Sequence, residues 1–168
     1  MEIQGWRDPL SELDLESRLA SFNAAMRALW QHYRAELDSA AYFAMTLESH
    51  MLLRDVAGRP VTRLEGRLDL SKLLGLEGVS LCHHVIAPVV VRGWNAQQGL
   101  PKEDEPALGR GSTLLFRIEP GGEEAVLERL TLIEAEGLGR RRTQGFGRLR
   151  ICDPFHYDFV LREMRGAS

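Results

Sequence analysis

The residues best suited to chemistry in this sequence lie in one short segment, residues 137–150. The segment reads GLGRRRTQGFGRLR and holds four glycines, five arginines and no acidic residue. Glycine permits positive backbone φ angles, and successive exposed peptide N–H groups form a concavity that binds anions. Arginine adds charge and paired N–H donors that match phosphate oxygens. The segment is therefore predicted to bind a polyphosphate backbone, with a solvated turn as the alternative.

Two common phosphate-binding motifs do not describe this segment. A dinucleotide-binding loop follows a strand and opens a helix, whereas residues 137–148 are predicted to follow a helix and open a strand. A P-loop needs Gly-Lys-Ser/Thr, which does not occur. We call residues 137–148 the glycine–arginine loop. The net charge of the whole chain, −3, conceals this basic segment. Residues 137–150 carry +5, so the rest of the chain carries −8.

Length and composition favour an ordinary globular protein. The 168 residues correspond to about one domain, with 27% charged and 44% hydrophobic residues. No apolar run approaches the roughly 20 residues that span a bilayer, and the opening MEIQGWRDPL lacks a secretory pattern. Two cysteines, Cys82 and Cys152, exclude a disulfide-dense scaffold and a four-cysteine zinc site. A cytoplasmic protein without metal or cofactor is expected, with no membrane partner.

The elements that must position the loop begin with a long helix. Residues 1–40 form the predicted N-terminal helical segment, with Asp8 and Pro9 suited to its first turn. Apolar residues recur along one helical face at Leu15, Leu19, Phe22, Met26, Leu29, Tyr33 and Leu37. We expect this stripe to pack on the domain or on a partner chain.

The remainder, residues 41–168, is predicted to form a mixed domain. Alternating and apolar runs indicate strands at 42–48, 79–91 (bent at Pro88), 113–118 and 148–152. Helices are predicted at 69–75 and 121–136, and a long loop at 92–111. The order strand, helix, strand, strand, helix, strand is that of an α+β, ferredoxin-like βαββαβ domain. Its helices are expected to cover one sheet face and leave the other free.

The glycine–arginine loop resembles the glycine-rich loop of RAMP proteins, the CRISPR-associated superfamily of RNA-binding subunits. In that family the loop also lies between the last helix and last strand of a ferredoxin-like domain. YFAMTLESHMLLRD (42–55) is similar to the first strand and turn of one branch. Gly93-Trp94-Asn95, Leu100-Pro101-Lys102 and Gly111-Ser112 resemble the pattern of the large type III-D subunit; the type III-B counterpart is more distant. The resemblance covers roughly residues 42–153.

The resemblance implies a non-catalytic subunit that holds guide RNA in a CRISPR type III effector complex. Other effector subunits are the expected partners, including a chain or segment that supplies a second RAMP domain, to which the N-terminal helix would dock. The loop amides of residues 137–147 are expected to contact RNA. Trp94, in the loop predicted at 92–111, is expected either to stack on an unpaired base or to anchor that loop in the core. The full set of predicted RNA-binding residues is Gly137, Gly139, Arg140, Arg141, Arg142, Gly145, Phe146, Gly147, Arg148, Arg150, Trp94, Lys102 and Arg110.

Two alternatives remain open. Some RAMP relatives process guide precursors with a histidine base, so a metal-independent endoribonuclease is one, with His83, His84 and His156 as its candidates. His83 and His84 are adjacent on a predicted strand and must point to opposite faces. The second alternative is a structural subunit whose basic loop contacts an acidic protein surface.

Overall fold

The computed structural model describes residues 13–32, 40–55, 57–62, 64, 72, 74–95, 97, 99–101 and 103–158. Its centre is an antiparallel sheet of four strands, β1 (Ala41–Leu47), β2 (Val79–Val85), β7 (Thr113–Ile118) and β8 (Leu149–Ile151). Their spatial order is β2-β7-β1-β8, which matches the ferredoxin-like arrangement of the four predicted strands. The α+β fold class is thus confirmed.

Alternation along the central strands explains which sheet face is buried. Residues of β7 alternate between half-buried and buried, and its buried residues are Leu114, Phe116 and Ile118. Phe43 of β1 stands opposite Phe116, and the two rings stack with centroids 4.8 Å apart. Helix α3 (Glu123–Glu136) contributes its own buried face to the same core, namely Val126, Leu130 and Ile133.

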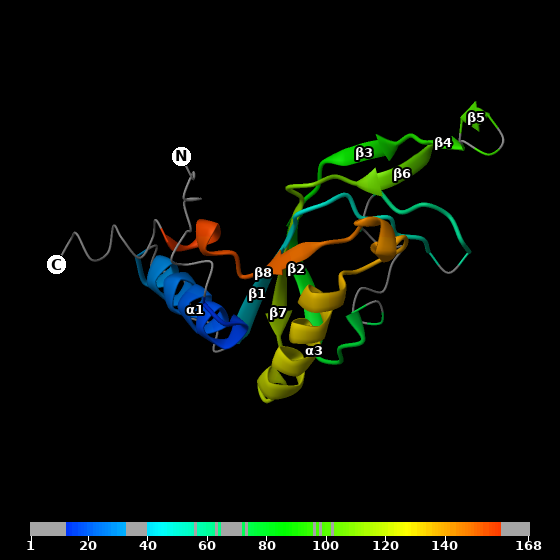
Figure 1. The fold of residues 1–168 in the computed structure, drawn as a ribbon. Helices are drawn as coiled ribbons and strands as arrows, with labels where there is room; N and C mark the ends of the chain where they lie inside the picture. The colour runs from blue at the N-terminus through cyan, green and yellow to red at the C-terminus, as the bar shows by residue number, and fades with distance from the viewer. Residues whose placement is uncertain are drawn as a thin grey trace, which may run out of the picture.

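Helix α1 (Leu15–His32) lies on the side of the sheet away from α3 (Figure 1). Asp14 caps it by accepting the Ser17 N–H at 2.7 Å. Asn23 pairs with the backbone of Tyr42, accepting its N–H and donating to its carbonyl oxygen, both at 2.8 Å. The amide thus takes the place of a neighbouring strand beside the start of β1.

The position of α1 corrects two expectations. Trp30 of α1 packs against Tyr42, which is next to Phe43 in β1 and therefore points to the sheet face opposite the one that α3 covers. Because α1 also contacts β8, the prediction that this second face stays free is wrong at its β1–β8 end. Its apolar stripe also belongs to the core of the domain, with Leu15 and Phe22 buried and Leu19, Met26 and Leu29 packed beside them. The stripe therefore gives no support to docking on a missing half. Asp8, Pro9, Tyr33 and Leu37 lie outside the described residues.

A β arm spans residues 88–108, and three of its short strands lie within the loop predicted at 92–111. β3 (Pro88–Val91) pairs antiparallel with β6 (Glu105–Leu108), and β4 (Trp94–Asn95) pairs with β5 (Leu100–Pro101) near the tip. The arm extends away from the four-stranded sheet (Figure 1). The break between β2 and β3 lies at residues 86–87, directly before Pro88.

Two further expectations concern helices. Most of the predicted helix 69–75 lies outside the described residues, although Lys72 and Leu74 are helical. Among the described helices, none has the length and apolarity needed to cross a membrane.

Candidate nucleic-acid interface

The segment that follows β1, residues 48–52, is hydrogen-bonded both to the end of β6 and to the glycine–arginine loop. On one flank, the Met51 N–H donates to the Leu108 carbonyl at 2.8 Å. On the other, the Arg140 N–H donates to the Leu52 carbonyl at 2.9 Å, and the Gly147 N–H to the His50 carbonyl at 2.8 Å. The segment thereby fixes the glycine–arginine loop beside the residues that follow β6.

Close packing explains why glycine recurs in the loop. A Cβ on Gly147 would lie 1.8 Å from the Leu138 carbonyl oxygen, and one on Gly139 would lie 2.6 Å from that of Leu52. Both residues also have positive φ, 74° and 87°, where side chains are strained. These glycines therefore shape the loop and let its backbone approach residues 50–53.

Most of the loop amides are used inside the protein. The N–H groups of Gly137, Gly145 and Gly147 donate to backbone carbonyls at 2.8–2.9 Å. That of Arg148 donates to the Ser49 hydroxyl at 2.9 Å. The amides of Gly137, Gly145 and Gly147, which were expected to contact RNA, are therefore already bonded within the protein, and the structure gives that expectation no support at these three residues. Any anion must be held chiefly by the side chains.

The arginines divide into two groups, and the first stabilises the loop. Arg141 reaches Glu105 of β6 at 3.1 Å and stacks over the Phe146 ring, with its guanidinium carbon 4.7 Å from the centroid. Arg142 pairs with Glu136 at 3.1 Å, and Arg150 lies 3.7 Å from Glu134.

The carboxylate of Glu105 joins the arm to the loop. It accepts from Arg141 and also from Arg54, at 3.2 Å. Burial alone raises the pKa of Glu105, but hydrogen bonds from the two guanidinium groups outweigh it and hold this pKa below its usual value. Glu105 therefore stays ionised at neutral pH and keeps its ion pair with Arg141.

The second group of arginines faces solvent. Arg110, Arg140 and Arg148 are exposed, and none of the three forms an ion pair with any residue that the structure describes. All three are anchored through their backbone to residues 49–52. The Arg110 N–H donates to the His50 ring, the Arg140 N–H to the Leu52 carbonyl and the Arg148 N–H to the Ser49 hydroxyl. Three exposed guanidinium groups without an ion pair among the described residues thus belong to one hydrogen-bonded scaffold.

Sequence reasoning missed His50, which lies between these arginines. Its Nδ1 accepts the Arg110 N–H at 3.1 Å, and its carbonyl accepts from Gly147. A neutral ring with Nδ1 in this role carries its proton on Nε2, so it offers a donor and has no free lone pair for a base. The available sequence signal for a functional role of His50 was its place next to Ser49, two residues after the strand predicted at 42–48.

The three histidines considered as bases are not brought together. His83 stands opposite Leu115 and His84 opposite Leu114, so they point to opposite faces of β2 as predicted. His156 lies across the sheet, with its Nε2 2.7 Å from the Thr46 hydroxyl. Among the described residues, no group of histidine, cysteine and acidic side chains is arranged to hold a metal.

The remaining predicted contacts lie on or near the arm. Trp94 is 62% exposed in β4, close to the tip and away from the sheet (Figure 1). Lys102 lies outside the described residues. Arg92 and Asp104 form an exposed pair at 3.4 Å on the same arm. The structure therefore groups Arg110 with Arg140 and Arg148, and leaves Trp94 apart from them.

Comparison with known proteins yields structural matches only. No protein-family model and no curated protein matches the chain. A chain of a partial Cas6-RT-Cas1–Cas2 complex matches at 14% identity and a TM-score of 0.49, over 78% of this chain and 26% of that one. A chain of a type III-B Cmr-beta complex bound to cognate target RNA matches at 12% identity and a TM-score of 0.40, over 83% of this chain and 66% of that one. The chain thus spans about a quarter of the first matched chain.

Proposed function

We propose that this chain is a non-catalytic RNA-binding subunit of a CRISPR type III effector complex, of the type III-D kind, and that it holds guide RNA. The observation that carries the proposal is the cluster of exposed arginines on the scaffold of residues 48–52, Arg110, Arg140 and Arg148, none of which has an ion pair in the part of the chain that the structure describes. The resemblance of the loop and of residues 93–112 to RAMP proteins supplies the class of RNA. Other effector subunits, one of which provides a second RAMP domain, complete the assembly.

The chemistry of the cluster suits an RNA backbone. Guanidinium groups donate pairs of hydrogen bonds to phosphate, and binding releases the counterions condensed on the strand. Arg141 and Arg142 support this surface indirectly, because their ion pairs with Glu105 and Glu136 shape the loop. Contacts of this kind read the backbone and tolerate any base sequence.

The hydrogen bonding of the His50 imidazole, next to the arginine cluster, supports binding of RNA over its cleavage. His50 is the histidine anchored beside the arginines, and its Nδ1 is already an acceptor for the Arg110 N–H. It would therefore donate from Nε2 to a phosphate oxygen. A general base for RNA cleavage needs a free ring nitrogen within reach of a 2′-hydroxyl.

Recovery of RNA from the native cell tests the proposal. The tagged chain is purified with its bound RNA, which is then sequenced, beside the Arg140→Ala/Arg148→Ala variant. The control variant Arg59→Ala/Arg92→Ala removes two exposed arginines that pair with Asp55 and Asp104. We expect repeat-derived RNA with the wild type and the control, and its loss in the first variant. RNA of the same composition as the lysate, or equal recovery from both variants, would contradict the proposal.

Cleavage is measured on the same samples. A labelled repeat RNA is incubated with the purified chain and chelator, and we expect it to remain intact. A specific product that disappears in a single histidine variant would favour the endoribonuclease instead.

A further inference from the structure

A pocket of about 370 Å³ opens where α3 ends and the glycine–arginine loop begins. This volume lies within the range of about 300–1,000 Å³ typical of small-molecule sites. The walls come from residues 52–54, from the last two turns of α3 and from the loop up to Arg142. The pocket is therefore part of the same scaffold that anchors Arg140.

The pocket has an apolar floor. Leu53, Ile133 and Leu138 line it and are buried, and Leu132 lines it while 45% exposed. Leu132 sits in the penultimate turn of α3, so it presents apolar surface to solvent at the pocket's edge. A flat apolar ligand group would cover this surface.

The rim of the pocket is basic. Four arginines and one glutamate line it, namely Arg54, Arg129, Arg140, Arg142 and Glu136. Arg54 pairs with Glu105 and Arg142 with Glu136. Arg129 is held in place because its Nε donates to the Leu74 carbonyl at 2.7 Å. Neither Arg129 nor Arg140 has an ion pair among the residues that the structure describes. An anionic group is thus favoured at the mouth.

We propose that this pocket receives one nucleotide of the bound RNA, with its base against Leu132 and Leu138 and its phosphate at Arg129 and Arg140. The inference rests on the proposed function, since Arg140 belongs both to the pocket and to the backbone-binding cluster. A strand on Arg140 and Arg148 therefore passes the mouth of the pocket. The combination of an apolar floor with Arg129 and Arg140, which have no ion pair among the described residues, matches a base with its phosphate. An acidic peptide with an apolar anchor is the competing occupant.

The first test removes the base and keeps the protein unchanged. Single-stranded RNA oligomers carrying one abasic site, moved position by position, are titrated against the wild-type chain. A base pocket predicts one position at which loss of the base weakens binding by about tenfold, within the range found for base stacking. A flat profile across all positions would overturn the pocket.

The second test fills the pocket. Leu132→Trp places a large ring at the mouth from an exposed position, and Ala135→Trp adds the same ring to an exposed position of α3 that does not line the pocket. We expect Leu132→Trp to weaken binding of the intact oligomer by about tenfold and to abolish the position-specific effect of the abasic site. Equal affinities of the two variants would overturn the proposal, as would an acidic peptide that binds the pocket in place of RNA.

These experiments distinguish a failure of the pocket assignment from a failure of the proposed function. If Arg140→Ala/Arg148→Ala loses RNA binding while the abasic profile is flat, the pocket assignment is wrong and the proposed function stands. If the wild type binds no RNA, both are wrong. Circular dichroism of each variant confirms that the fold is retained.

Discussion

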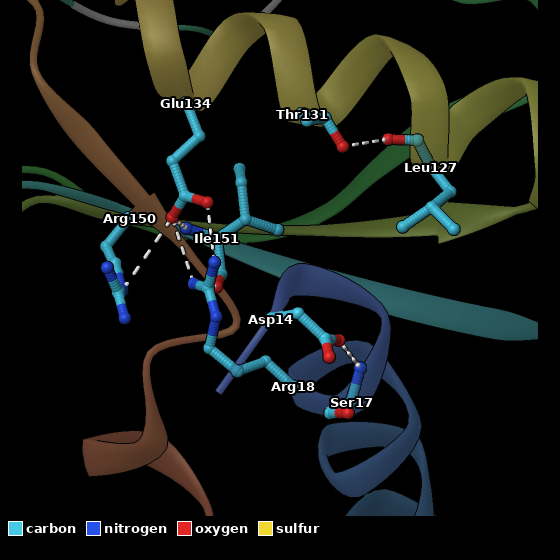
Figure 2. Close-up of polar contacts among 8 residues, drawn as sticks. All are labelled: Asp14, Ser17, Arg18, Leu127, Thr131, Glu134, Arg150 and Ile151. Atoms are coloured by element: carbon cyan, nitrogen blue, oxygen red, sulfur yellow. Dashed lines mark hydrogen bonds and ion pairs between the residues drawn. The ribbon is translucent and has the colours of Figure 1, made fainter. Parts of the chain in front are cut away.

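Removal of Glu134 should destabilise the protein more than removal of its partner Arg18. Arg18 is almost fully buried, with 4% of its side chain exposed, and its guanidinium reaches the Glu134 carboxylate at 2.5 Å and the Ile151 carbonyl oxygen (Figure 2). Glu134 also accepts the Ile151 N–H at 3.0 Å and lies 3.7 Å from Arg150. The pair therefore satisfies both backbone groups of Ile151 on the edge strand β8 and ties α1 to α3.

The magnitudes follow from what each substitution leaves behind. Glu134→Ala leaves a buried guanidinium without its counter-charge, which costs about 3–5 kcal/mol of unfolding free energy. Arg18→Met fills similar space and leaves Glu134, 19% exposed, with its remaining donors. That variant loses the bond to the Ile151 carbonyl and should cost about 1–3 kcal/mol.

Urea unfolding followed by circular dichroism measures both variants at pH 7. We expect a larger loss of unfolding free energy for Glu134→Ala. Equal losses, or a larger loss for Arg18→Met, would show that the guanidinium is not held in a buried site.

The pH dependence of the same pair has a defined sign. Burial alone raises the pKa of Glu134, but hydrogen bonds from Arg18 and from the Ile151 N–H outweigh it and hold this pKa below the ordinary value of 4.5. A lowered folded pKa stabilises the protein above about pH 4.5, and this contribution is lost as the pH falls through the folded pKa. The stability difference between wild type and Glu134→Ala should therefore shrink on acidification. A difference that grows would contradict the assignment.

Three further predictions concern the close approach at Gly147, the hydrogen bonds of Asn23 and the reactivity of the buried Cys152. Gly147→Ala should lower the melting temperature more than Gly145→Ala, because both have positive φ and only Gly147 lacks space for a Cβ; equal shifts would contradict the close approach. Asn23→Ala removes both bonds to the edge of β1 and should cost roughly 1–3 kcal/mol in urea unfolding, and an unchanged midpoint would refute that role. Burial raises the pKa of Cys152 to about 12, so mass spectrometry after alkylation at pH 8 should show modification of exposed Cys82 alone in the folded chain and of both in urea.

Much of the sheet follows from local pattern. The short apolar run at residues 113–118 predicted β7 at its observed bounds. Burial alternates along this central strand because one of its faces lies on the core and the other is half-exposed. The order of elements then predicted the ferredoxin-like topology. The glycine–arginine loop was likewise placed correctly between α3 and β8.

Other features depend on contacts that pattern does not contain. Arg18 and Asn23 are polar residues on a helix, and they are buried because they satisfy backbone groups at the sheet edge. Residues 105–108 read EPAL, a poor strand sequence, yet they pair with 88–91. The division of arginines into paired and free ones also depends on acids distant in sequence, such as Glu105.

The salt dependence of RNA affinity tests the central claim most directly. Affinity of the wild type for a labelled single strand is measured at several salt concentrations, beside Arg140→Ala/Arg148→Ala and the charge-matched control Arg59→Ala/Arg92→Ala. Each lost phosphate contact should reduce the slope of log K against log salt by about 0.7, so the first variant should lose about 1.4 and the control almost nothing. Equal slopes for the two variants would show that the exposed arginines beside residues 48–52 do not bind an RNA backbone.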